Sequence, residues 1–141
     1  MSFIQLSTHG STPFERLLGH KPDLLDQWEK LELTFFQSKT FDAHFLEQVR
    51  RALAFNNQCQ YCMAKAGKPD QNPKDTRLIE ALRFANTFAI SHDAINESEI
   101  TRLKNYFSEA ELVELTAFCS FISASQKLGA VMGLKAMTHY E

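Results

Sequence analysis

Two of the chain's three cysteines stand three positions apart, as Cys59 and Cys62, and thiols at this spacing are suited to redox chemistry. Near the start of a helix, such thiols face the same side and come within reach of each other. The free N–H groups and the dipole at a helix start favour the thiolate form, which attacks peroxides and disulfides. A neighbouring thiol then converts the resulting sulfenic acid into a disulfide. Lys65, three positions beyond Cys62, adds positive potential to the same segment.

Two other interpretations of the cysteine pair compete with the redox one. A structural zinc site needs a second pair of ligands at similar spacing, whereas Cys119 stands alone on an apolar helix face and no histidine pair accompanies it. Unreactive cysteines are often packed in a core, but the neighbours Asn57, Gln58 and Gln60 are polar. A thioredoxin-like motif is not supported, because no βαβ strand precedes the pair. We favour the redox interpretation, expect no metal, and assign Cys119 to the core.

Glu47 is an acidic residue twelve positions before Cys59, and Arg50 and Arg51 follow it by three and four positions. Opposite charges at these helical spacings form solvated ion pairs worth about 0.2–0.5 kcal/mol each. On spacing alone, the ion pair is the simpler interpretation of Glu47. A part in proton transfer requires a further observation that ties this carboxylate to the cysteines.

The composition is that of an ordinary globular protein and argues against several functional classes. The chain has 141 residues, 44% of them hydrophobic and 23% charged, which fits one domain and argues against long disorder. Its net charge of −2 lacks the basic excess of a nucleic-acid-binding protein. No apolar run has the roughly 18–20 residues that cross a bilayer, and the first residues do not resemble a secretion signal. We therefore expect a cytoplasmic protein with reduced thiols and with neither membrane nor nucleic-acid partners.

Prolines and glycines, which interrupt regular structure, are absent from residues 23–66 and 74–128. All-β domains need turns at short intervals, so stretches of this length without either residue favour an all-α fold. We predict a single-domain bundle of about six helices over residues 22–141. Residues 1–21 are expected to form an N-terminal arm.

The first helices are predicted from apolar residues at helical spacing. In 22–38 these are Leu24, Trp28, Leu31 and Phe35, and in 41–55 they are Phe45, Leu46, Val49 and Leu53. Each set occupies one helical face, and we expect that face to be buried. The last helix is rich in small residues toward its end, which fit either dense packing within the chain or a subunit interface.

Polar residues and breakers indicate where the other helices begin and end. A short helix that carries the cysteines should end at Gly67, followed by a loop over residues 67–73. The expected N-caps are Asn57 for the cysteine helix, Asn72 before Pro73 for the next helix, Asn96 with Glu99, and Ser108 with Glu111.

The segment 47–66 resembles the signature of the alkylhydroperoxidase AhpD-like, or carboxymuconolactone decarboxylase-like, superfamily. Members of its redox branch carry a glutamate, a C-x-x-C pair twelve residues on, and a histidine four residues after the second cysteine. Glu47, Cys59 and Cys62 occupy the first three of these positions. The flanking Val-Arg-Arg-Ala-Leu-Ala-Phe-Asn-Asn and Gln-Tyr-Cys segments also resemble the family, and the all-helical prediction agrees with its fold. The resemblance covers roughly residues 41–67, and the later helices agree only in type and order.

The chain departs from the family pattern at the histidine position, which Ala66 occupies. In the family, the glutamate and this histidine are thought to relay a proton to or from the thiols, and such help is typically worth about 10²–10⁴ in rate. His44, one turn before Glu47, is a candidate replacement, although a surface histidine at a helix start is the commoner role. Tyr61 stands where some members have a histidine, and it is suited either to donating a hydrogen bond or to packing.

The resemblance implies a thiol-dependent hydroperoxidase that needs no cofactor. Cys62, ionised with help from Glu47, would attack the peroxide, and Cys59 would close a disulfide that a thiol reductant or redox partner protein reduces. Family members assemble as homo-oligomers, commonly trimers or hexamers. Two other classes remain open: a non-catalytic oligomeric redox sensor, and an enzyme of the lactone-decarboxylase branch, whose chemistry does not call for a dithiol.

Overall fold

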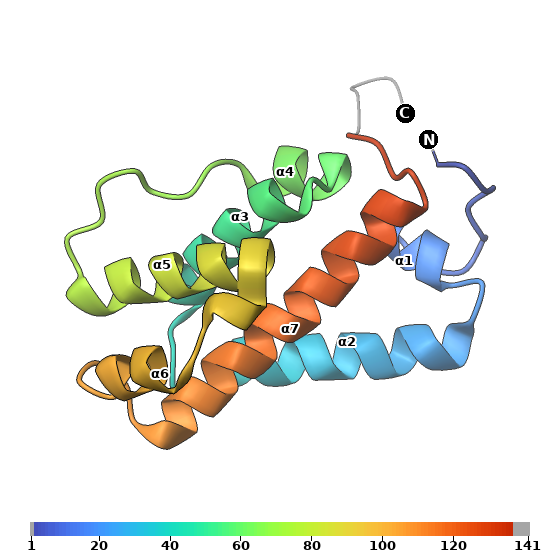
Figure 1. Ribbon diagram of the computed structural model, residues 1–141. Coiled ribbons are helices and arrows are strands. Elements are labelled where there is room, and N and C mark those ends of the chain that lie inside the picture. The colour runs from blue at the N-terminus through green and yellow to red at the C-terminus, as the bar shows by residue number, and fades with distance from the viewer. Residues whose placement is uncertain (1, 137–141) are drawn as a thin grey trace.

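The computed structural model describes residues 2–136, and all regular elements in this range are helical (Figure 1). Seven α-helices and one short 3-10 helix follow one another between residues 2 and 136, where no strand occurs. They are α1 Pro13–Leu18, α2 Pro22–Gln37, α3 Ala43–Asn57, α4 Gln60–Ala66, α5 Thr76–Ser91, η1 His92–Ala94, α6 Glu97–Leu103 and α7 Glu109–Val131. The all-helical prediction is confirmed, and the helix beyond the expected six is α1, inside the segment predicted to be an arm.

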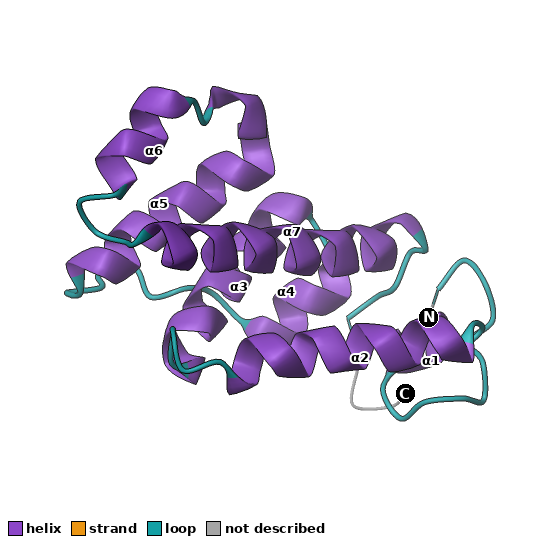
Figure 2. Ribbon diagram, turned by 90° about the horizontal axis from the view of Figure 1, so that it is seen from below, coloured by secondary structure: helices purple, strands orange, loops and turns teal. Residues whose placement is uncertain are grey.

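Helices α3 and α7 form the centre of the bundle (Figure 2). Helix α3 packs against α5 and α7, and α4 packs against both α3 and α7. Val49 and Leu53 of α3, with Leu115 and Phe118 of α7, have no exposed surface. Phe35 of α2 meets Phe118 edge to face, with ring centroids 5.5 Å apart. Because α4 rests on the two central helices, the core determines where the cysteines lie.

Helix α2 buries only part of the predicted face, because Phe35 is buried and Trp28 packs on the core but the two leucines do not. Leu25 is buried, whereas Leu24 is 50% exposed and Leu31 is 45% exposed. The helix docks on α7 through Trp28, whose indole N–H donates a hydrogen bond to the Ser125 hydroxyl at 2.8 Å. This contact turns the face centred on Leu24 and Leu31 partly toward solvent.

Two of the four predicted N-caps are confirmed, and the N-caps of α4 and α5 are different residues. Asn96 caps α6 and Ser108 caps α7, as predicted. Helix α5 begins later than predicted, because Asp75 and not Asn72 is its N-cap. The Asp75 carboxylate accepts the N–H of Arg77 at 2.9 Å, and a negative charge at this position also interacts favourably with the helix dipole. The loop after α4 therefore extends to residue 75.

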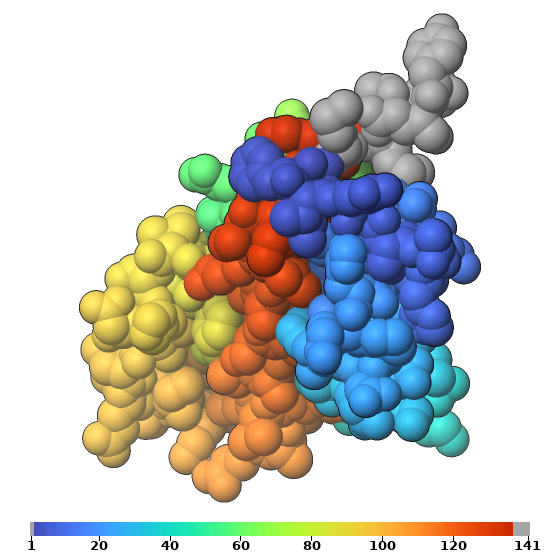
Figure 3. Space-filling view, turned by 90° about the vertical axis from the view of Figure 1, so that its right-hand side faces the viewer, coloured from blue at the N-terminus to red at the C-terminus, as the bar shows by residue number. Residues whose placement is uncertain are grey.

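The N-terminal segment packs against the end of the bundle. Thr12 and Glu15 form a capping box at the start of α1, and the backbone N–H groups of Thr12 and Ser11 hold the pKa of Glu15 below its usual value. The Phe3 N–H donates a hydrogen bond to the Met132 carbonyl at 2.8 Å. The first residues, in dark blue, lie across the red end of α7 (Figure 3). This segment thus covers the end of α7 that lies beside the cysteine helix.

Glu111 stabilises the start of α7 in a pH-dependent way. Its carboxylate accepts the N–H of Ser108 at 2.8 Å and pairs with Arg77, and these contacts hold its pKa below the usual 4.5. Since its folded-state pKa is lowered, its contribution to stability is present above the unfolded pKa and is lost as pH falls through the folded one. We expect Glu111→Gln to lower the free energy of unfolding in urea by about 1 kcal/mol at neutral pH, and by less in acid.

The matched control for this prediction is Glu109→Gln in the same helical turn. Glu109 is 80% exposed on its side chain and pairs only with Lys104 among the described residues, so its replacement should change stability little. Equal losses for Glu111→Gln at neutral and acidic pH would contradict the expected role of its carboxylate.

Candidate active site

The cysteine helix α4 begins at a sharp turn after α3. Gln58 takes a left-handed conformation, with a φ of 55°, between the end of α3 and Cys59. Cys59, and not Asn57 as predicted, is the N-cap of α4, because its Sγ accepts the N–H of Cys62 at 3.2 Å. Gly67 ends the helix as predicted, with a φ of 78° that favours glycine. The two cysteines therefore flank the first turn of α4.

Cys59 and Cys62 form a disulfide, with their Cα atoms 5.1 Å apart. The two residues differ in access, because Cys59 has no exposed surface and Cys62 is half-buried. Cys59 belongs to a small apolar cluster between the N-terminal segment and the end of α7. The other members are Tyr61, Leu134, Leu6, Phe14, Ala130 and Cys62. The expectation that polar neighbours keep this segment out of a core is therefore wrong for Cys59.

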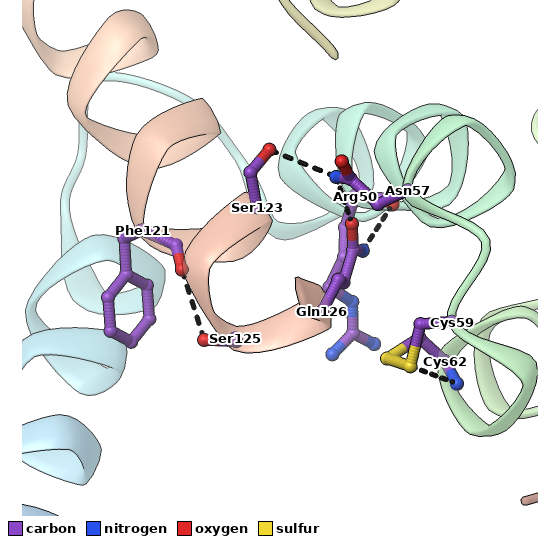
Figure 4. The surroundings of a disulfide bond; sticks show 8 residues. All are labelled: Arg50, Asn57, Cys59, Cys62, Phe121, Ser123, Ser125 and Gln126. Carbon is purple, nitrogen blue, oxygen red and sulfur yellow. Dashed lines mark hydrogen bonds between the residues drawn. A yellow bond between two sulfur atoms is a disulfide. The ribbon is translucent and has the colours of Figure 1, made fainter. Parts of the chain in front are cut away.

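One of those polar neighbours joins a network that ties the end of α3 to α7 (Figure 4). The side-chain amide of Asn57 donates to the Ser123 hydroxyl at 3.0 Å and to Oε1 of Gln126 at 2.8 Å. Gln126 is only 3% exposed, and its Nε2 donates to the backbone carbonyl of Arg50 at 3.2 Å. The polar groups of this network are hydrogen-bonded to one another. The network therefore holds the turn before Cys59 in place, while the cluster around Cys59 remains apolar.

A cavity of about 170 Å³ lies beside Cys62. Helices α1, α2, α3, α4 and α7 all contribute to its walls, so distant parts of the chain assemble it. Its apolar walls are formed by Phe14, Leu25, Trp28, Phe121 and Ile122. Cys62 and Tyr61 also line the cavity, whereas Cys59 does not. A small molecule in the cavity would therefore meet Cys62 and not its disulfide partner.

Charged side chains of both signs line this cavity. The cations are Arg50 of α3 and Lys65 of α4, and the carboxylates are Glu15, Glu29 and Glu32. Arg50 is the more buried cation, with 24% of its side chain exposed, and Lys65 is exposed. The Nζ of Lys65 lies 5.7 Å from the centre of the Tyr61 ring. Lys65 therefore lies near Cys62, as predicted, on the wall of the cavity. Arg50, which was predicted only as an ion-pair partner of Glu47, lines the same cavity.

Glu47 lies one turn before Arg50 on α3 and is not among the cavity-lining residues. Its carboxylate lies 2.8 Å from Nη2 of Arg50 and 3.7 Å from Nε of Arg51. The ion pairs predicted from spacing are therefore present. Glu47 is connected to the cavity through Arg50, which pairs with it and lines the wall.

His44 is not brought to the cysteines. It is exposed at the start of α3, and roughly 20 Å of helix separates it from Asn57 at the other end. Ala66, at the family histidine position, does line the cavity, but its methyl group is unable to carry a proton. Tyr61 is 5% exposed and packs with Cys59 while it lines the cavity.

Cys119 is a core residue, as predicted. It has no exposed surface on α7, and burial raises the pKa of its thiol to about 12. Between residues 2 and 136, no three histidine, cysteine, aspartate or glutamate side chains come together as a metal site. Over the same part of the chain, no helix combines the length and apolar character needed to cross a membrane.

Most of the cavity-lining residues were not predicted. Gln126 could have been identified from the sequence as a buried polar residue, because it is a long polar side chain among mostly small and apolar residues of α7. Trp28 and Arg50 were identified only as a core residue and an ion-pair partner. Their place at the cavity depends on how α2, α3 and α7 pack, and a local sequence pattern does not show this.

Gly129 of α7 packs directly against Cys59. A Cβ added at Gly129 would lie 3.1 Å from the Cys59 Sγ, a sulfur that is fully buried and has little freedom to move. We expect Gly129→Ala to lower the free energy of unfolding by about 1 kcal/mol, measured in urea. In a Cys59→Ala background the clash is gone, and the same substitution should be neutral or stabilise by up to about 1 kcal/mol through helix propensity. Equal effects in the two backgrounds would show that the sulfur is not the crowded neighbour.

Comparisons with known proteins establish a relationship of fold. No family model matches the chain, and no curated protein matches it. The structure is similar to the crystal structure of an uncharacterized peroxidase-related protein from Silicibacter sp. TM1040, with a TM-score of 0.79. The similarity covers 91% of this chain and 78% of that one, at 13% sequence identity. At this level of identity, the similarity shows a common fold.

Proposed function

We propose that the protein is a thiol-dependent hydroperoxidase in which Cys59 and Cys62 cycle between dithiol and disulfide. The observation that carries the proposal is that the two sulfurs are bonded to each other while only Cys62 lines the cavity. Two findings support it: the fold shared with a peroxidase-related protein, and the resemblance to the AhpD-like superfamily at Glu47, Cys59 and Cys62.

The proposed cycle needs only the two thiols, a hydroperoxide and a thiol reductant. The Cys62 thiolate attacks the outer peroxide oxygen, the O–O bond breaks, and the departing oxygen takes up a proton to leave as an alcohol. The Cys59 thiol then attacks the Cys62 sulfenic acid, which releases water and closes the disulfide. The two electrons lost by the thiols have by then reduced the peroxide. A thiol reductant or redox partner protein restores both thiols by exchange.

Three of the four remaining predicted site residues have supporting parts in this proposal. Glu47 is a positioning residue that acts through Arg50, because it pairs with Arg50 and does not line the cavity. Lys65 adds positive potential at the cavity wall, and Tyr61 packs between the cavity and Cys59. His44 has no part, since it is exposed at the opposite end of α3.

The proposal includes a homo-oligomer, a trimer or hexamer, as the family resemblance implies. Large apolar side chains are exposed on two helices, at Leu24, Leu31 and Leu33 of α2 and at Val113 and Val131 of α7. Exposed apolar side chains of this size are common where another subunit packs. Light scattering after size-exclusion chromatography measures the oligomer directly. The proposal also places the chain in the cytoplasm, where a dithiol is kept reduced between turnovers.

The test of the proposed function combines mass spectrometry with a turnover assay. Treatment of the reduced protein with tert-butyl hydroperoxide should remove two hydrogens, about 2 Da, from the peptide that contains residues 59–62, and dithiothreitol should restore them. Continuous loss of hydroperoxide in the presence of dithiothreitol would then show catalysis. A protein that neither loses these hydrogens nor consumes hydroperoxide is not a hydroperoxidase of this kind.

A non-catalytic redox sensor is the second candidate, and Ala66 favours it. The family histidine position faces the cavity with a methyl group, so the proton relay of the family is incomplete. A sensor would form the disulfide stoichiometrically but would not turn over with a thiol reductant. An enzyme of the lactone-decarboxylase branch is less favoured, because its chemistry does not call for the dithiol at Cys59 and Cys62.

A further inference from the structure

We propose that Arg50 is a catalytic residue of this site, whose guanidinium group stabilises the Cys62 thiolate and the oxygen that leaves the peroxide. The inference rests on the proposed function and gives a role to a residue other than the glutamate, the two cysteines and the histidine of the family motif. It also identifies a group that stabilises the negative charge of the thiolate in a site that has alanine at position 66.

The position of Arg50 supports this role. Arg50 and Cys62 line the same cavity, and in Figure 4 the guanidinium group extends from α3 toward the side on which the disulfide lies. The Nε of Arg50 is buried and has no hydrogen-bond partner among the described residues, so it does not open onto the cavity. About a quarter of the side chain remains exposed, at 24%. Arg50 is therefore a partly buried cation at the wall that Cys62 also forms.

Two contacts hold the Arg50 side chain and backbone in this place. Its Nη2 lies 2.8 Å from the Glu47 carboxylate, and its backbone carbonyl accepts a hydrogen bond from Gln126 at 3.2 Å. Since Glu47 occupies one terminal nitrogen and Nε is buried, the other terminal nitrogen is left for the cavity. A planar group that is fixed at one edge is well suited to orienting its remaining donors.

The other charged groups at the cavity are less suited to the task. Lys65 is exposed and lies over the Tyr61 ring, so solvent weakens its field at the sulfur. Three carboxylates also line the cavity, from Glu15, Glu29 and Glu32. Their negative charge disfavours a thiolate. Arg50 is thus the partly buried cation that offsets them.

The chemical step explains what the guanidinium group does. The Cys62 thiolate forms an S–O bond as the O–O bond breaks, and the departing oxygen receives the electron pair before water protonates it. Negative charge therefore passes from the sulfur to that oxygen, and fixed N–H donors stabilise both ends of the transfer. Unlike a histidine, an arginine keeps its charge throughout the neutral pH range, so it acts by electrostatics and not by proton transfer.

The test compares Arg50→Gln with Arg51→Gln in a Cys59→Ser background, with both folds checked by circular dichroism. Arg51 is the matched control because it also pairs with Glu47 and has a buried Nε without a hydrogen bond, yet it does not line the cavity. The first readout is the thiolate fraction at neutral pH, from ultraviolet absorbance without peroxide. Cys119 does not contribute to it, because burial raises the pKa of that thiol to about 12.

We expect Arg50→Gln to reduce the thiolate fraction of Cys62 about tenfold and the rate of its reaction with tert-butyl hydroperoxide about 10²-fold. Arg51→Gln should change neither by more than about twofold. Arg50→Lys should restore part of the thiolate fraction, and Arg50→Met, which keeps the length of the stem, should match Arg50→Gln.

An unchanged thiolate fraction in the neutral Arg50 variants, or an equal fall in Arg51→Gln, would overturn the assignment of Arg50. If the parent consumes no hydroperoxide, the proposed function fails, and the thiolate comparison still decides whether Arg50 acts on Cys62. The two failures are therefore distinguishable.

Discussion

Replacing Cys62 by serine is expected to reduce hydroperoxide turnover with dithiothreitol about 10³-fold or more. Cys62 is the cysteine that lines the cavity, whereas Cys59 has no exposed surface and is not among the lining residues. A serine hydroxyl at neutral pH is a far weaker nucleophile than a thiolate, and removal of the attacking atom typically abolishes covalent catalysis. Peroxide consumption measured against time at equal protein concentration checks this result.

Two further variants separate attack from resolution. Cys59→Ser should still react once with hydroperoxide, because Cys62 is intact, and should then stop with a sulfenic acid that a dimedone-type reagent traps. Cys119→Ser should turn over at the rate of the parent, since the Cys119 thiol is buried in the core. If Cys62→Ser consumes hydroperoxide as fast as the parent, Cys62 is not the attacking residue and the proposed cycle is wrong.

The helices of this chain were predictable because their signals are local. In α3, the predicted face of Phe45, Leu46, Val49 and Leu53 is buried. The caps at Asn96 and Ser108 lie where the spacing to a glutamate placed them. A capping hydrogen bond joins residues three positions apart, so the sequence contains both partners in one short segment.

Most of the features that were missed depend on partners far along the chain. Helix α1 is an exception, because its capping box at Thr12 and Glu15 is local but lies in a segment with the glycine, serine and threonine content of a loop. Leu25 is buried in place of Leu24 because α2 docks on α7 through Trp28. The burial of Cys59 involves Leu134, some 75 positions later, and no local pattern shows that contact.

The candidate site also combines features that local spacing predicts with features that depend on distant parts of the chain. The pair Cys59 and Cys62 could be predicted from spacing, and so could the ion pair between Glu47 and Arg50. The cavity could not, because five helices contribute to it. As a result, the sequence identified the cysteine pair and the ion pair, but not that Arg50 and Cys62 line the same cavity. It also did not show that the two sulfurs have unequal access, which has consequences for how the disulfide is reduced.

In the reduced protein, Cys62 is expected to react with iodoacetamide at least about 100-fold faster than Cys59. Cys59 has no exposed surface, and a reagent reaches it only when the cluster formed with Tyr61 and Leu134 opens. Peptide mass spectrometry after short exposure to the reagent measures the two rates separately. In guanidinium chloride, where the cluster is unfolded, the two rates should become similar, which is the control for intrinsic reactivity.

We expect the same difference in access to determine which sulfur a reductant attacks. The incoming thiolate should bond to Cys62, breaking the disulfide and releasing Cys59 as the leaving thiolate, because only the Cys62 side faces the cavity. Cys59→Ser, loaded with an aromatic disulfide, should therefore form a stable mixed disulfide on Cys62, and Cys62→Ser should form almost none on Cys59. Equal labelling of both variants would mean that the cluster over Cys59 opens during reduction. The N-terminal segment and the end of α7, which pack against Cys59, would then have to move in each cycle.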